Sequence, residues 1–366
     1  MWGAPPRVRG ADRVRVPVTA VDAPQRLRAL ITTPLEAELV EGLRQRHRAV
    51  DFILPESLLA PARFPAHHPF ATVADHPERE REWNALLDTA DILVDFGPVE
   101  LQSRLRARPR LRWIQTTSSG VGELVQRVGL ADSDLPVITT ASGVHAGPLA
   151  EFALLGMLWC AKRVPHLLDQ QRAHRWERSA TTELAGRVVV VVGMGRVGTA
   201  VAGACAALGM RVVGCTRRPR AGAGSPAEPI VPVEELDAWL PRADFLVISC
   251  PLTAATHHLI DAARLARLPQ GAVLINVGRG PCVVESALIA SLRDGHLGGA
   301  VLDVVEHEPL APDSPLWDLP QVLLSPHSAS TVASENSRIV AIFDDNLGRF
   351  QRGEPLRNRL DKHAGY

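Results

Sequence analysis

One apolar run constrains the fold of this chain more than any other feature, because it leads directly into a glycine-rich turn. Residues 187–200 read RVVVVVGMGRVGTA, in which five consecutive valines precede Gly193-Met194-Gly195-Arg196-Val197-Gly198. A β-branched run without a polar member predicts a strand buried on both faces, and such strands belong mostly to parallel sheets. With a helix expected over 199–208 and a second strand over 211–215, the stretch predicts a β-α-β unit.

The three glycines of this turn are typical of a dinucleotide-binding site. Gly193 allows the tight turn, Gly195 lets the backbone approach a pyrophosphate, and Gly198 lets the next helix pack closely on the strand. The helix N-terminus then offers unpaired N–H groups and a partial positive charge to the phosphates. We predict a dinucleotide site here; an ordinary glycine-rich turn is the alternative.

The residues after the second strand indicate which coenzyme is bound. An NAD site needs a carboxylate there for the ribose hydroxyls, whereas a 2′-phosphate needs cations. This chain has Thr216-Arg217-Arg218-Pro219-Arg220 and no acid. Guanidinium groups bind phosphate with charge-assisted hydrogen bonds, so NADP(H) is favoured and NAD(H) stays possible. The alternative is a solvated turn, because arginine is frequent throughout the chain.

Length and composition limit the class of protein further. The 366 residues exceed the size at which one core usually stops growing, so we expect two domains. A formal net charge of zero argues against nucleic acid or an anionic membrane as partner, and no apolar run is long enough to cross a bilayer. The five cysteines show neither a metal-ligand spacing nor a disulfide framework, so we expect no metal site and a cytoplasmic protein.

Strands and helices alternate along the whole chain after residues 1–25, which we expect to form a disordered tail. In the first part we expect strands over 27–32, 50–54, 91–96, 111–115 and 135–139, and helices over 34–47, 78–89, 99–107 and 123–128. In the second we expect a helix over 148–172 that Pro165 kinks or breaks, strands over 244–249, 272–277, 299–303 and 322–325, and helices over 263–268 and 285–294. This alternation predicts parallel sheets covered on both faces.

A last helix, expected over 334–352, carries Ile339, Phe343, Leu347 and Phe350 on one face. Because the second sheet is already complete, we expect this face to pack on the first domain. The predicted fold is therefore α/β, with two Rossmann-like domains. A dinucleotide-binding domain, residues 148–332, is inserted into a discontinuous substrate domain, residues 26–147 plus 333–366. A cleft between two such sheets is the usual place for a small ligand.

Several motifs resemble one family closely. They are ASGVHAGPLAEFALLGML (141–158), GMGRVG (193–198), CPLTAATHHLI (250–260), INVGRGPCVVESAL (275–288), LDVVEHEPL (302–310) and SPHSAST (325–331). From Trp113 to the C-terminal helix the chain resembles the D-2-hydroxyacid dehydrogenases, which include glyoxylate/hydroxypyruvate reductases and phosphoglycerate dehydrogenases. The resemblance implies the same two-domain fold and a homodimer formed through the cofactor domain.

Reduction of a 2-keto acid needs a hydride, a proton for the carbonyl oxygen and a cation for the carboxylate. Arg279 follows a strand and can present a planar fork to the carboxylate and the ketone. His327 follows the strand at 322–325, and its pKa suits proton transfer. Glu308 can pair with that imidazole, as its family counterpart does, because the Glu-Pro step of the family motif falls on it and not on Glu306.

The resemblance also implies further contacts, each of which could equally be an ordinary core or loop residue. In the family, the positions of Arg196, Val197, Pro251, Thr256 and Val277 line the cofactor, and that of Asp303 contacts the nicotinamide amide. The turn 118–122, with Ser119 and Gly120, matches a loop whose backbone N–H groups bind the substrate carboxylate. Family members often carry Asp where this chain has Gly122.

We therefore predict an oxidoreductase that transfers a hydride between NAD(P)H, with NADPH favoured, and a small 2-keto acid, with His327 as the proton donor. Glyoxylate, hydroxypyruvate or a branched 2-keto acid is the expected substrate, and the sequence does not choose among them. Phosphite and phosphoglycerate dehydrogenases are alternatives. A formate dehydrogenase is disfavoured, because that group pairs its histidine with Gln and not with Glu. A nucleotide-sensing corepressor resembling C-terminal binding protein is an alternative of a different class.

Overall fold

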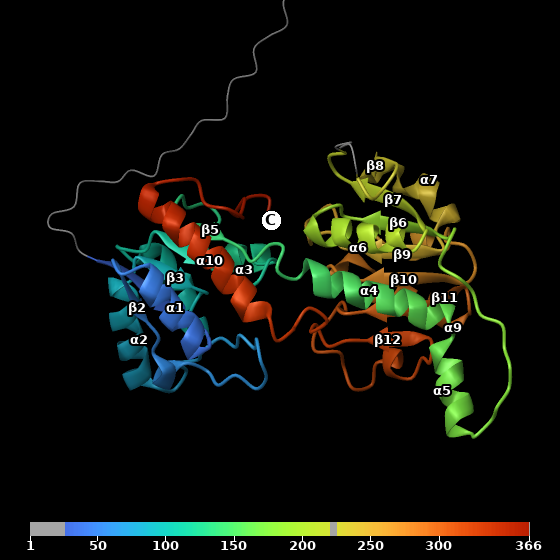
Figure 1. The fold of residues 1–366 in the computed structure, drawn as a ribbon, viewed down its shortest axis with the longest axis horizontal. Coiled ribbons are helices and arrows are strands. Elements are labelled where there is room, and N and C mark those ends of the chain that lie inside the picture. The colour runs from blue at the N-terminus through green and yellow to red at the C-terminus, as the bar shows by residue number, and fades with distance from the viewer. Residues whose placement is uncertain (1–25, 220–224, 366) are drawn as a thin grey trace, which may run out of the picture.

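The computed structural model describes residues 26–219 and 225–365, and it contains two sheets that lie in separate lobes (Figure 1). The expected tail, residues 1–25, and Arg220 lie outside the described residues. The first sheet has the order β2-β1-β3-β4-β5 and all of its pairings are parallel. Its strands are β1 (Leu27–Ile31), β2 (Val50–Ile53), β3 (Ile92–Val94), β4 (Trp113–Gln115) and β5 (Val137–Thr139). These are the five strands expected for the first part of the chain.

Helices connect these strands. They are α1 (Ala37–Arg46), α2 (Pro77–Thr89) and α3 (Gly122–Arg127), together with the 3-10 helices η1 (Glu56–Leu58) and η2 (Val99–Ala107). Two differences from the expected elements are visible. The first helix begins at Ala37 and not at residue 34, because its N-cap Glu36 is still extended, with ψ 135°. Residues 99–107 are wound as a tighter 3-10 helix.

The second sheet is larger and has the order β12-β11-β10-β9-β6-β7-β8, again with parallel pairing only. Its strands are β6 (Val188–Val192), β7 (Arg211–Thr216), β8 (Ile230–Pro232), β9 (Phe245–Ile248), β10 (Ala272–Asn276), β11 (Leu297–Leu302) and β12 (Val322–Leu324). The order reverses between β6 and β9, which is the switch point where such sheets bind dinucleotides. The glycine-rich turn follows β6 and therefore lies at this point.

Helix α6 (Arg196–Ala207) follows that turn and begins three residues earlier than expected. Gly195 is its N-cap, and the N–H of Thr199 donates to the Gly195 carbonyl at 2.9 Å. Arg196, Val197 and Gly198 therefore form the first turn of the helix, where N–H groups lack intrahelical partners. The helices that come after α6 in this domain are α7 (Leu236–Trp239), α8 (Ala262–Leu265) and α9 (Glu285–Arg293), with the 3-10 helices η3 (Val233–Glu235), η4 (Leu240–Arg242), η5 (Gly280–Cys282) and η6 (Pro315–Trp317).

The helix expected over 148–172 is two helices, α4 (Ala146–Ala161) and α5 (Val164–Arg172). The break lies at Arg163, whose φ of 52° is left-handed, and not at Pro165. Pro165 lies in the first turn of α5, where the missing N–H costs no hydrogen bond. In Figure 1, α4 starts between the two lobes and runs along the second sheet.

Helix α10 (Glu335–Arg352) returns to the first lobe, as Figure 1 shows. Val340, Phe343 and Leu347 are buried in one cluster with Trp113 of β4. The Trp113 and Phe343 rings stack with their centroids 5.2 Å apart. The expected insertion of one sheet domain into another is therefore confirmed.

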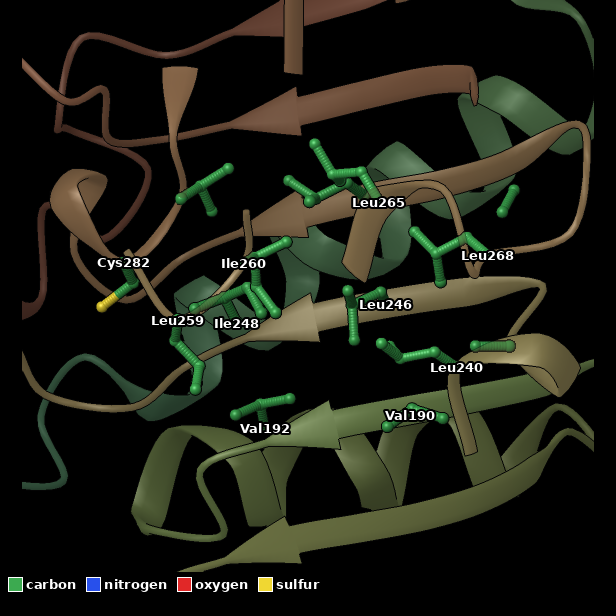
Figure 2. Packing of buried hydrophobic residues seen from close by; sticks show 14 of the residues in the cluster. Val190, Val192, Leu240, Leu246, Ile248, Leu259, Ile260, Leu265, Leu268 and Cys282 are labelled. Atoms are coloured by element: carbon green, nitrogen blue, oxygen red, sulfur yellow. The ribbon is translucent and has the colours of Figure 1, made fainter. Parts of the chain in front are cut away.

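Apolar side chains cover both faces of the second sheet. On one face, Val190 and Leu246 lie in one buried cluster with Leu265, which belongs to the segment that follows β9 (Figure 2). Burial of one such side chain contributes about 1.5–3 kcal/mol to the stability of the fold relative to exposure. This packing holds in place the strand ends that carry the site. No helix in the described ranges is long and apolar enough to cross a membrane.

Candidate active site

The loop after β12 holds His327 through its backbone. The N–H of His327 donates to the carbonyl of Asp303 at 2.8 Å, and its φ of 52° is left-handed. Oδ1 of the buried Asp303 accepts from Ser325 Oγ at 2.7 Å and from the N–H groups of Ser328 and Ala329, both at 2.9 Å. The carboxylate of Asp303 thus fixes the loop on both sides of the histidine.

The expected pairing of His327 with Glu308 is present. Nδ1 of His327 lies 2.8 Å from Oε2 of Glu308, and Oε1 of Glu308 accepts from the Val305 N–H at 3.3 Å. The hydrogen bond from the imidazole to Glu308 raises the pKa of His327, against the effect of burial. Burial tends to raise the pKa of Glu308, but the hydrogen bond and charge of His327 outweigh it, so that this pKa is lowered. Both groups therefore favour their charged forms.

Glu306, the competing acid, pairs elsewhere. Its Oε1 lies 2.6 Å from Nε2 of His258, and its Oε2 accepts from the N–H of Glu285 at 2.9 Å. These contacts tie the loop after β11 to the loop 251–260. Glu306 is thus a carboxylate that holds two loops together, and Glu308 is the acid that contacts His327.

Arg279 reaches from the second sheet to the first. It follows β10, and its guanidinium donates from Nη1 to the Gly278 carbonyl at 2.7 Å and from Nη2 to the Gly120 carbonyl at 3.2 Å. A Cβ on Gly120 would lie 1.3 Å from Nη2, so only glycine leaves room for the arginine. The charge of Arg279 opposes part of the rise in the pKa of His327 and contributes to the lowered pKa of Glu308, so the guanidinium acts electrostatically on this pair.

The glycine-rich turn has the shape that a pyrophosphate requires. Gly193 has φ +101°, and a Cβ there would lie 2.6 Å from the Cys250 nitrogen. A Cβ on Gly198 would lie 1.9 Å from the Gly193 carbonyl oxygen, so strand and helix are in direct contact. A Cβ on Gly195 would meet nothing within 4 Å. The first and third glycines therefore serve packing, and the second faces open space at the N-terminus of α6.

A cavity of about 610 Å³ opens at this turn. It is lined by Gly143, Ala146, Met194, Gly195, Arg196, Thr199 and Ala200. Gly195 and Arg196 were expected here from the sequence, whereas Gly143 and Ala146 were not, because they belong to the segment that enters α4. The size, the open glycine and the helix N-terminus fit a dinucleotide.

The other residues expected at the cofactor are not among those that line this cavity. Thr216 is the last residue of β7, and Arg217 and Arg218 follow it. The end of this strand lies beside Gly193, whose N–H donates to the Cys215 carbonyl at 2.8 Å. Val277 is buried in the apolar core with Val197 packed against it, and Thr256 Oγ1 donates to the Pro251 carbonyl at 2.7 Å. Their predicted contacts with the cofactor stay predictions.

The C-terminal segment explains why the chain departs from the family at Gly122. A Cβ at Gly122 would lie 2.3 Å from the carbonyl oxygen of Gly365, so an aspartate cannot occupy this position. The same segment places Oδ1 of Asn358 3.3 Å from Nη2 of Arg196. Neither contact was expected from the sequence, because both partners come from segments without a motif.

The fold and this site define a dinucleotide-dependent dehydrogenase. Residues 154–329 match the family profile described as D-isomer specific 2-hydroxyacid dehydrogenase, NAD binding domain. Glyoxylate/hydroxypyruvate reductase B from Yersinia pestis (strain Pestoides F) is 35% identical over 283 residues, covering 74% of this chain and 84% of that relative. The chain belongs to the D-isomer specific 2-hydroxyacid dehydrogenase family, whose members are oxidoreductases that act on CH–OH groups.

Solved structures agree with this assignment. A D-isomer specific 2-hydroxyacid dehydrogenase from Xanthobacter autotrophicus Py2, in complex with NADPH and MES, is 30% identical with a TM-score of 0.73, covering 93% of this chain and 100% of that one. An NADPH-dependent glyoxylate/hydroxypyruvate reductase from Sinorhizobium meliloti, in complex with NADP and sulfate, is 28% identical with a TM-score of 0.72 and the same coverage.

Proposed function

We propose that the protein reduces a small 2-keto acid to the D-2-hydroxy acid with NADPH, in the cleft between the two sheets. The observation that carries the proposal is the hydrogen bond of Arg279 to the Gly120 loop, together with the His327–Glu308 pair on which the charge of Arg279 acts. A cation, a proton donor and a backbone loop are the groups that this reduction requires. The domain boundaries expected from the sequence, 26–147 plus 333–366 and 148–332, belong to the proposal and are supported by the packing of α10 on the first sheet.

In this reaction the side chains orient the substrate and move a proton. Arg279 holds the substrate carboxylate together with the N–H groups of Ser119 and Gly120 and polarises the ketone. Nδ1 of His327 is committed to Glu308, so Nε2 donates the proton to the carbonyl oxygen. The bound coenzyme supplies the hydride that adds to C2. Glu308 stabilises the imidazolium before the transfer and fixes the orientation of the ring.

The coenzyme is proposed to be NADP(H), bound with its pyrophosphate at Gly195 and its 2′-phosphate at the arginines after β7. Arg217 and Arg218 are exposed at the carboxyl end of β7. The relatives from Xanthobacter autotrophicus and Sinorhizobium meliloti were solved with NADPH and NADP. Asp303, close to His327, is proposed to contact the nicotinamide amide. NAD(H) is the alternative coenzyme, and its kcat/KM must be measured beside that of NADP(H).

Glyoxylate and hydroxypyruvate are the proposed substrates, because the relatives that are 35% identical carry the name glyoxylate/hydroxypyruvate reductase B. The proposed assembly is a homodimer through the cofactor domain. Leu155 and Leu167, on α4 and α5, are 54% and 47% exposed, and Trp176 is 99% exposed. Apolar side chains gathered on adjacent helices are typical of a subunit interface. The cysteines are free thiols, which supports a reducing, cytoplasmic location.

Steady-state kinetics with NADPH and NADH across a panel of 2-keto acids tests the function. Turnover of glyoxylate or hydroxypyruvate, with a higher kcat/KM for NADPH, is expected. In the His327→Asn variant turnover should be lost, while the Kd for NADPH stays within about twofold because His327 is proposed to act on the substrate. Nucleotide binding without turnover in the wild type would instead indicate a nucleotide sensor of the same fold.

A further inference from the structure

The chain crosses between the two sheets twice, and the two crossings pack against each other. The first crossing follows β5 and enters α4, and the second follows β12 and enters α10. Ala141, Val144 and Ile339 form one buried cluster between them, and Arg338 Nη1 donates to the Val144 carbonyl at 3.4 Å. Figure 1 shows the start of α4 between the lobes. These two crossings, which pack together, are therefore the segments of chain that connect the domains.

A polar pair lies beside this apolar cluster. Nε2 of His145 lies 3.0 Å from Oε1 of Glu335, and the two side chains are only 14% and 7% exposed. The second oxygen of Glu335, Oε2, is buried without a hydrogen-bond partner among the residues that the structure describes. Burying a carboxylate is unfavourable, and replacing a buried ion pair by well-packed apolar residues is often neutral or stabilising. The pair therefore calls for a reason other than stability.

The other ring nitrogen of His145 supplies that reason. Its Nδ1 lies 3.3 Å from Oγ of Ser119. Because the Glu335 carboxylate can only accept, Nε2 of His145 carries a proton. In the neutral ring Nδ1 is then an acceptor, and the Ser119 hydroxyl donates to it. Glu335 thus selects the tautomer that holds Ser119.

The loop of Ser119 is held from both domains. Arg279 Nη2 donates to the Gly120 carbonyl at 3.2 Å from the side of the second sheet. Ala141 N–H, in the first crossing, donates to the Ser118 carbonyl at 3.1 Å, and His145 holds the next side chain. The N–H groups of this loop can bind a substrate carboxylate well only if the loop backbone is fixed, because both groups must point at the same ligand.

We propose that His145, oriented by Glu335, is a positioning residue that fixes the substrate loop to the interdomain crossings. The inference rests on the proposed function for its effect on substrate. His145 acts through Ser119 and touches neither the substrate nor the reacting atoms. It thereby couples the binding of the substrate carboxylate to the relative placement of the two domains.

The structure offers a matched control. Nε2 of His47 lies 2.6 Å from Oδ1 of Asp344, so that this histidine also joins α10 to another element, and its side chain is 12% exposed. His47 is far from the loop of Ser119 along the chain and does not contact it. His145→Ala and His47→Ala each remove a partly buried histidine–carboxylate contact on the same helix. His47→Ala also removes a 3.0 Å contact between Nδ1 and Oε1 of Gln351, and only His145→Ala releases Ser119.

Kinetics separate positioning from stability. In His145→Ala the KM for glyoxylate should rise about fivefold to tenfold, while kcat and the Kd for NADPH stay within about twofold. Ser119→Ala should have a similar effect, and the double variant should be no worse than the stronger single one, because both remove the same contact. His145→Gln, which keeps one donor and one acceptor, should restore most of the affinity. His47→Ala should leave KM unchanged.

Hydrogen exchange measures the loop without turnover. The N–H groups of residues 116–122 should exchange faster in His145→Ala than in the wild type, and at the wild-type rate in His47→Ala. Unchanged exchange in His145→Ala would overturn the inference, and so would independent, additive effects of Ser119→Ala and His145→Ala on KM. A wild type without turnover on any 2-keto acid would overturn the proposed function and the claimed effect on substrate, and the exchange rates would still decide whether His145 holds the loop.

Discussion

Replacing Gly120 by alanine is the sharpest test of the contact between the two domains. The new Cβ would lie 1.3 Å from Nη2, 2.5 Å from Cζ and 3.2 Å from Nε of Arg279. Non-bonded heavy atoms in contact stay about 3.5 Å apart, so the guanidinium must move by roughly 2 Å. Because the atoms in the way belong to the end of a flexible side chain, Arg279 moves and the backbone keeps its place.

A misplacement of about 1 Å in a group that orients the substrate can lower the rate by about 100-fold. We therefore expect kcat/KM for glyoxylate to fall by about 100-fold or more in Gly120→Ala, which corresponds to about 2.7 kcal/mol of transition-state stabilisation. The oxidation of NADPH measures the rate, and Tm and the Kd for NADPH should stay near the wild-type values. Gly203→Ala in α6 is the matched control, since its Cβ meets nothing within 4 Å. Wild-type kcat/KM in Gly120→Ala would show that Arg279 does not act against this loop.

Three further variants test charged groups, two of them in the proposed site and one, Asp95, buried in the first domain. Because the hydrogen bond to Glu308 raises the pKa of His327, and reduction needs the imidazolium, Glu308→Gln should shift the fall of reductive kcat/KM with rising pH to lower pH; an unshifted pH profile would refute the pairing. Arg217→Asp with Arg218→Ser should turn the kcat/KM preference toward NADH, and unchanged use of NADPH would place the 2′-phosphate elsewhere. Burial raises the pKa of Asp95 from 3.8 to about 6, equivalent to about 3 kcal/mol. The stability that the protonated carboxyl provides is therefore complete below pH 3.8 and is lost as pH rises to about 6. Asp95→Asn should then exceed the wild type in Tm at pH 8 but not at pH 4, and a Tm difference independent of pH would contradict this.

The local pattern of apolar residues was sufficient to predict most of the helices and strands. The valine run before Gly193 predicted a strand, and the apolar face of residues 334–352 predicted a helix packed on the first domain. Both predictions were possible because an element buried on one or both faces has a characteristic spacing of apolar residues. Strand β8 (Ile230–Pro232) was missed, since it is short and ends in a proline. The start of α6 was placed three residues late because the glycines of the turn, which are poor helix formers, continue into its first turn.

The site was predictable where a motif carries it. Glu308 and His327 belong to two such motifs, and their contact is present. The contact of His145 with Glu335 was not predicted, because the two residues are separated by 190 positions. The contact of Gly122 with Gly365 was not predicted either, because Gly365 is distant in sequence and lies in a segment without periodicity. Long-range contacts between loops leave no local trace, and only the folded chain shows them.

The groups of the proposed site follow the carboxyl ends of strands from both sheets. Gly120 comes after β4 of the first sheet, whereas Arg279 and His327 come after β10 and β12 of the second. Neither domain therefore contains a complete site, and the hydrogen bond from Arg279 to Gly120 exists only when the edges meet. A carboxylate held between the arginine and the loop favours the same approach of the domains. Because both crossings of the chain pack together, we expect the domains to approach each other about these crossings when substrate binds, so that binding and the exclusion of water occur together.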